Sequence, residues 1–111
     1  MVNYLKKTKI RNLLISMGYP VPALGKCSYK FYRGSEWLIF DAGLNDESYY
    51  NVYISGYMSI ERCIYDEYEN RVTTLERRFF KGNEVFDLLK LVSWWRIFYG
   101  WYLSNFSGKT F

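Results

Sequence analysis

Residues 93–103 read SWWRIFYGWYL, and this aromatic stretch near the end of the chain decides how the rest of the fold is arranged. A membrane-spanning helix needs about 20 largely apolar residues. In the segment 85–106 the charged residues Asp87, Lys90 and Arg96 interrupt the apolar ones. Because a charge at the bilayer centre is costly, we predict a helix that packs within the protein and no transmembrane segment.

The helix is predicted over residues 84–106, after the break at residues 81–83. Asn83 is a residue type that caps helix N-termini well, and Glu84 and Asp87 lie where the helix dipole favours acidic side chains. At about 100° per residue, the polar residues of this helix share one stripe about 120° wide. The stripe consists of Lys90, Ser93, Arg96, Gly100 and Ser104.

The rest of this helix surface, about 240° of it, is apolar, whereas a helix lying on a sheet needs only a little over 100°. We expect the sheet to bury one side, formed by Leu88, Leu89, Val92 and Trp95. The surplus has two interpretations. Either the sheet curls around the helix and buries it, or the surplus forms an exposed patch of the kind that binds partners.

For the exposed alternative, the predicted interface is an edge of the helix formed by Trp94, Phe98 and Trp101, with Arg96 at its rim. Tryptophan and arginine are favoured at the energetic centres of interfaces. Such an edge can also pair with itself about a two-fold axis. We therefore expect a partner protein, which is either another protein or a second copy of this chain in a homodimer.

The remainder of the chain predicts a second helix and a sheet. Residues 3–17 carry apolar side chains at helical spacing, and Gly18 ends that helix. Alternating and apolar runs then predict strands at 28–33, 37–43, 49–55, 57–65 and 71–80. The fourth is predicted as a strand with a bulge, narrowly preferred to a helix.

The connections between these strands are short, which favours antiparallel pairing. We therefore predict a single α+β domain over residues 1–111. It has an N-terminal helix, an antiparallel sheet of four to five strands, and a long aromatic C-terminal helix packed on the sheet.

The net charge of +4 is local to the N-terminal helix, where Lys6, Lys7, Lys9 and Arg11 lie. These cations are either a solvated helix face or a patch that contacts anions such as nucleic-acid phosphates or an acidic protein. If they were exposed, the strand aromatics could stack on bases. Those aromatics are Tyr29, Phe31, Tyr32, Tyr50 and Tyr53.

Catalysis is not expected from this composition. The chain has no histidine, which is the commonest general base and metal ligand. Cys27 and Cys63 have no metal-type spacing. We predict that both are free thiols in a reducing, cytoplasmic setting, and we expect no metal or cofactor.

These observations favour a small non-enzymatic protein-binding module that acts through the aromatic helix surface. An accessory or inhibitor-type protein would suit the size of the chain. The abundance of Tyr, Phe, Ile, Lys and Asn reflects A/T-rich codons, as in many phages and mobile elements. The alternative is a nucleic-acid-binding module that uses the N-terminal cations and the strand tyrosines.

Overall fold

The computed structural model describes residues 2–22, 26–41 and 43–102, with side chains described from residue 7 to residue 99. Its elements are α1 (Val2–Ser16), β1 (Cys27–Tyr32), β2 (Ser35–Asp41), β3 (Tyr49–Tyr53), β4 (Ser59–Asp66), β5 (Arg71–Phe79) and α2 (Asn83–Tyr102). The five strands form one antiparallel sheet in the order β1-β2-β3-β4-β5. The predicted α+β arrangement is therefore confirmed.

Helix α1 ends where its sequence predicts. Gly18 has a φ of +93°, a left-handed conformation that glycine adopts without a steric penalty. The amide of Tyr19 donates to the carbonyl of Leu14 at 3.0 Å, and the amide of Gly18 donates to Ile15 at 2.9 Å. This pair of bonds is the Schellman motif, which satisfies the last carbonyls of a helix.

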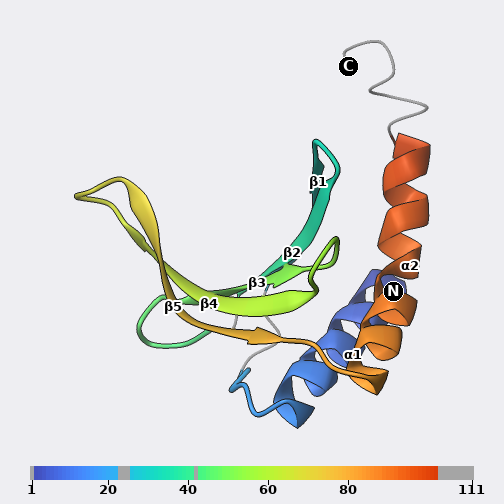
Figure 1. Ribbon diagram of the computed structural model, residues 1–111, viewed down its shortest axis with the longest axis horizontal. Coiled ribbons are helices and arrows are strands. Elements are labelled where there is room, and N and C mark those ends of the chain that lie inside the picture. The colour runs from blue at the N-terminus through green and yellow to red at the C-terminus, as the bar shows by residue number, and fades with distance from the viewer. Residues whose placement is uncertain (1, 23–25, 42, 103–111) are drawn as a thin grey trace.

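Both helices lie on one side of the sheet (Figure 1). Strand alternation explains which side chains they cover, since successive residues point to opposite faces. The fully buried residues of the sheet lie next to one another across neighbouring strands on that side. They are Leu38, Phe40, Tyr50, Val52 and Ile60. They form one core with Ile10 and Leu14 of α1 and Leu88 and Val92 of α2.

The opposite side of the sheet is here called the open face, because no helix of the described chain lies on it. It presents Trp37 and Ile39 of β2, Asn51 and Tyr53 of β3, and Glu61 of β4. Apart from the buried Glu61, these side chains are half-buried.

The fourth strand is confirmed as a strand with an irregular register. Arg62 pairs with Glu76 while Cys63 pairs with Thr74, which leaves Leu75 as the extra residue of a bulge. A bulge increases the local twist of a strand pair. The outer part of the β4–β5 hairpin extends well beyond the helices (Figure 1).

The predicted cap of α2 is wrong. The helix begins at Asn83 itself, and the carboxylate of Glu84 reaches back to accept the amide of Lys81 at 2.9 Å. This bond has the spacing of one half of a capping box, in which an acidic side chain accepts the backbone amide of the residue three positions before it. Residues 103–106, which the sequence assigned to this helix, lie outside the described residues.

The buried side of α2 is largely as predicted. Leu88, Val92 and Trp95 are buried in the core, whereas Leu89 is only half-buried. At about 100° per residue, Leu89 lies at the edge of the face that Leu88 centres.

Candidate functional site

Beyond its buried face, α2 carries a partly exposed apolar surface, here called the outer ridge and formed by the half-buried Trp94 and the exposed Ile97 and Phe98. The rings of Trp94 and Phe98 stack with centroids 5.4 Å apart and planes inclined by 10°. Ile97 is 73% exposed and Phe98 is 48% exposed. Since i,i+3 and i,i+4 side chains are neighbours on a helix, the three form one contiguous patch.

The structure brings together two of the residues predicted for this interface, Trp94 and Phe98. The side chain of Trp101 lies outside the described residues, so its prediction stays open. Ile97 was missed, although its spacing of three from Trp94 is the signal that could have found it. It is the most exposed member because it points away from both the sheet and α1.

Arg96, expected at the rim of the interface, is held within the chain. Its Nε donates to Oε2 of Glu36 at 2.7 Å, and its Nη2 donates to Oε1 at 2.6 Å. The hydroxyl of Tyr29 donates to the same carboxylate. Glu36 is only 6% exposed, whereas 41% of the Arg96 side chain remains accessible.

This cluster alters the protonation of its members. Burial by itself raises the pKa of Glu36, but hydrogen bonds from Arg96 and Tyr29, together with the charge of Arg96, bring it below its usual range. Burial and the bond to Glu36 raise the pKa of the Tyr29 hydroxyl. The carboxylate therefore stays ionised at neutral pH and anchors α2 to β2.

Tyr99 provides a second anchor for the C-terminal half of α2. Its ring lies edge-on to Tyr29 with centroids 5.5 Å apart and tilted against Phe31 at 6.0 Å. Its hydroxyl donates to the backbone carbonyl of Phe31 at 3.3 Å. Arg96 and Tyr99 hold one side of α2 against β1 and β2. The orientation of the outer ridge relative to the sheet is therefore fixed.

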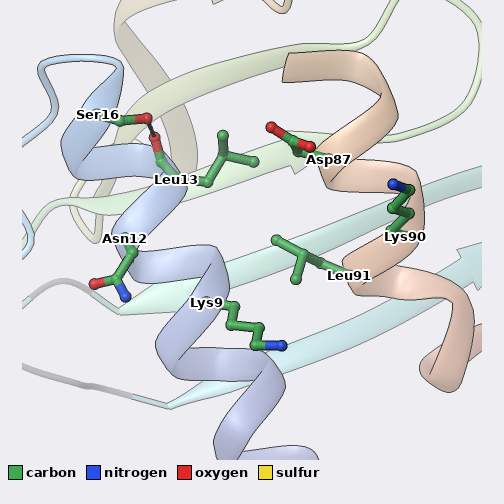
Figure 2. Close-up of a pocket in the computed structure, with 7 residues that line it drawn as sticks. All are labelled: Lys9, Asn12, Leu13, Ser16, Asp87, Lys90 and Leu91. Atoms are coloured by element: carbon green, nitrogen blue, oxygen red, sulfur yellow. Dashed lines mark hydrogen bonds between the residues drawn. The ribbon is translucent and has the colours of Figure 1, made fainter. Parts of the chain in front are cut away.

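A groove of about 530 Å³ runs between α1 and α2 (Figure 2). Leu13 and Leu91 point toward each other across it and form its apolar centre. Its polar lining is Lys9, Asn12 and Ser16 from α1, and Asp87 and Lys90 from α2. Trp94 follows Leu91 by three residues on α2, so the groove and the outer ridge are adjacent on one side of the molecule.

The N-terminal cations are not one exposed patch in the described structure. Lys9 lines the groove, but the Nε of Arg11 donates to the carbonyl of Val21 at 2.8 Å and both Arg11 and Lys7 are half-buried. The side chain of Lys6 lies outside the described residues. Arg11 thus holds the connector after α1.

The five strand aromatics do not share a stacking surface. Tyr50 is in the core, where its hydroxyl donates to the carbonyl of Pro20 at 2.9 Å. Tyr29 and Phe31 lie on the helix side with Tyr99, while Tyr53 is on the open face. Strand alternation, which sends neighbouring residues to opposite faces, separates them.

The buried carboxylates are ion-paired. Glu36 binds Arg96, and Glu61 on the open face binds Arg77. Among the described residues no group of three or more histidine, cysteine, aspartate or glutamate side chains is placed to hold a metal ion. Each of the two buried carboxylates is thus neutralised by an arginine from another element of the fold.

Both cysteines are free thiols. Cys27 is on β1 and Cys63 is on β4, three strand spacings or about 14 Å apart. A disulfide requires α-carbons within about 7 Å. Burial raises the pKa of Cys27 to about 12, with the charge of Lys7 opposing this slightly. Burial likewise raises the pKa of Cys63.

Neither helix, over its described residues, is long and apolar enough to cross a membrane. Comparison of the chain with protein-family models, with curated proteins and with solved structures finds no match.

Proposed function

We propose that this protein is a non-enzymatic binding module of accessory or inhibitor type, which binds another protein through the outer ridge of α2. The observation that carries the proposal is the exposure of Ile97 and Phe98 beside the stacked Trp94, on a helix whose other side is buried in the core. Exposed apolar patches of this kind mark partner sites.

The rigidity of the ridge supports this proposal. Arg96 and Tyr99 tie the same turns of α2 to the sheet, so little side-chain or backbone order has to be created on binding. Preorganised surfaces bind with a smaller entropic cost. The stacked pair of Trp94 and Phe98 is a large, stiff contact surface.

The adjacent groove suggests the character of the partner. Lys9 and Lys90 border its apolar centre, and Asp87 is the single carboxylate among its described lining residues. A partner surface with apolar side chains flanked by carboxylates would complement this arrangement. The two free thiols, Cys63 buried and Cys27 half-buried, fit a reducing compartment such as the cytoplasm. The abundance of residue types that A/T-rich codons encode fits a phage or mobile element.

The first experiment compares Ile97→Glu with Phe86→Glu. Phe86 is equally apolar and 67% exposed on α2, but it lies 11 residues away, about 16 Å along the axis. Neither change should alter the melting temperature, because both side chains are exposed. Sedimentation velocity shows whether the partner is a second copy of the chain. If the wild type self-associates, Ile97→Glu should abolish that self-association and Phe86→Glu should retain it.

If the wild-type protein sediments as a monomer, the three forms serve as immobilised baits in extract from the source cells. A partner should be retained by the wild type and by Phe86→Glu, and lost with Ile97→Glu. A monomeric wild type whose captured proteins are the same for all three baits would refute the proposal.

A further inference from the structure

The open face of the sheet carries a second concave site, which shares no lining residue with the outer ridge. A pocket of about 430 Å³ is lined by residues from the β1–β2 turn and from strands β2 and β3. These residues are Tyr32, Arg33, Ser35, Trp37, Asn51 and Tyr53. The helices lie on the other side of the sheet (Figure 1).

Strand register places the aromatic side chains of this pocket side by side. Trp37 pairs directly with Lys30 of β1 on one side and with Tyr53 of β3 on the other. Direct cross-strand partners have their β-carbons about 5 Å apart on one face. Trp37 and Tyr53 are half-buried and both line the pocket, so each ring borders the cavity that a planar ligand would enter.

Asn51 adds a polar group that the fold leaves incompletely paired. Its Nδ2 donates to the hydroxyl of Tyr53 at 3.1 Å, but its buried Oδ1 has no hydrogen-bond partner. Unpaired buried acceptors are costly and call for an explanation. A carboxamide beside aromatic rings is suited to the donor and acceptor edge of a base.

The rim of the pocket is cationic. Arg33 lines the pocket, and Lys30 lies beside it as the cross-strand partner of Trp37. Neither has an ion-pair partner among the described residues, and no carboxylate is among the residues that line the pocket. The guanidinium of Arg33 lies 5.1 Å from the centre of the Tyr32 ring. The nearest buried acid on this face, Glu61, is neutralised by Arg77.

Arg33 occupies a backbone conformation that arginine rarely adopts. Its φ is +49° and that of the next residue, Gly34, is +82°. A two-residue hairpin turn with both central residues left-handed normally uses asparagine, aspartate or glycine. Strain of this kind is found disproportionately at functional sites. Here it places a cation at the mouth of the pocket.

From these observations we infer that the open-face pocket binds single-stranded nucleic acid. Unpaired bases stack on Trp37 and Tyr53, and Lys30 and Arg33 contact the phosphates. Aromatic platforms bordered by cations bind single-stranded RNA and single-stranded DNA alike, because every base has a flat face on which to stack. This site does not use the N-terminal cations, and none of its lining residues belongs to the outer ridge.

The test measures fluorescence anisotropy of labelled 12-nucleotide oligo-uridine, oligo-thymidine and a duplex of the same length. Both single strands should bind. Comparing the affinity for oligo-uridine with that for oligo-thymidine tells whether the 2′-hydroxyl contributes to binding. Two phosphate contacts should make single-strand affinity fall about sevenfold between 50 and 200 mM salt. The duplex should bind at least about tenfold more weakly, because its bases are already stacked.

Three variants assign the binding to this pocket. Arg33→Asn should weaken binding and flatten its salt dependence while the melting temperature stays the same or rises, because asparagine tolerates a positive φ. Trp37→Leu should weaken binding at least about fivefold, with circular dichroism confirming the fold. The control Lys9→Ala/Lys90→Ala removes two cations from the helix groove, one more than Arg33→Asn removes from the pocket, and should still change affinity less than twofold.

Absence of binding to either single strand at 50 mM salt would overturn the inference. So would equal weakening by the groove control, or a duplex that binds as tightly as the single strands. The variant Ile97→Glu should bind the oligonucleotides as the wild type does. The oligonucleotide test can therefore fail while the protein-binding proposal for the outer ridge stands, and the reverse.

Discussion

Arg96 on α2 and Glu36 on β2 are 60 residues apart in the chain and joined by two hydrogen bonds, at 2.7 and 2.6 Å. This fork-to-fork pair connects the last helix to the second strand, and it fixes which side of α2 faces the solvent. A planar guanidinium is suited to bidentate contact with a carboxylate. The position of the outer ridge therefore depends on a pair that lies on the other side of the helix.

Arg96→Met should destabilise the fold because it leaves the carboxylate of Glu36 buried without its main partner. We expect a loss of about 2–4 kcal/mol, at the lower part of the range because the arginine side chain is 41% exposed. Urea denaturation measures it. The double variant Glu36→Leu/Arg96→Met should recover much of the loss, and a double variant as unstable as the single one would contradict this account.

Acid should weaken the same pair. The pKa of Glu36 is lowered in the folded protein, so between the folded and unfolded pKa values the unfolded chain binds a proton that the folded chain does not. This contribution to stability is complete above pH 4.5, the ordinary value, and is lost as pH falls through the folded pKa.

Glu36→Gln isolates that contribution from the other carboxylates. The variant should be less stable than the wild type at pH 7, and the difference in urea midpoint should shrink as pH falls below about 4.5. A difference that is constant from pH 7 to pH 3 would show that the protonation of Glu36 is not coupled to folding.

Trp95 should be among the side chains that contribute most to stability. It is buried between the sheet and α2, and its ring lies edge-on to Trp94 at 5.8 Å. Trp95→Ala should cost about 3–5 kcal/mol, the usual range for removing a large buried aromatic side chain. Lys90→Ala, an exposed change on the same helix, should stay within about 0.5 kcal/mol. An unchanged denaturation midpoint for Trp95→Ala would mean that the buried face is wrongly assigned.

The order of the elements and the core of α2 could be predicted from the sequence because both depend on local patterns. Leu88, Val92 and Trp95 follow helical spacing, and Gly18 is a conformational stop that needs no tertiary information. The interrupted alternation of Met58, Ile60 and Ile64 predicts a bulge in the fourth strand, but the extra residue, Leu75, lies on the partner strand β5.

Features that depend on pairing between distant segments could not be predicted. The inward turn of Arg96 requires Glu36 to lie opposite, and helical spacing alone places this arginine on the polar side. The open-face pocket requires Lys30, Trp37 and Tyr53 to lie in one row, which depends on the register of three strands. Strand alternation predicts faces, but it does not specify which residues of neighbouring strands meet.

The two thiols provide the last prediction. Burial raises the pKa of Cys27 to about 12, so at pH 8 very few molecules carry the reactive thiolate. The folded protein should therefore react with a thiol reagent such as Ellman's reagent far more slowly than the unfolded protein does. In denaturant, without any reductant, two thiols per chain should react at once, since β1 and β4 lie too far apart for a disulfide.

Trp95→Ala offers a matched comparison for this measurement. By loosening the core, it should raise the population of open molecules, and so speed thiol modification at neutral pH in proportion to the lost stability. Rapid modification of the folded wild type would contradict the shielding of the Cys27 thiol. A monomer that shows no reactive thiols in denaturant until reductant is added would carry a Cys27–Cys63 disulfide, and that would contradict the strand order.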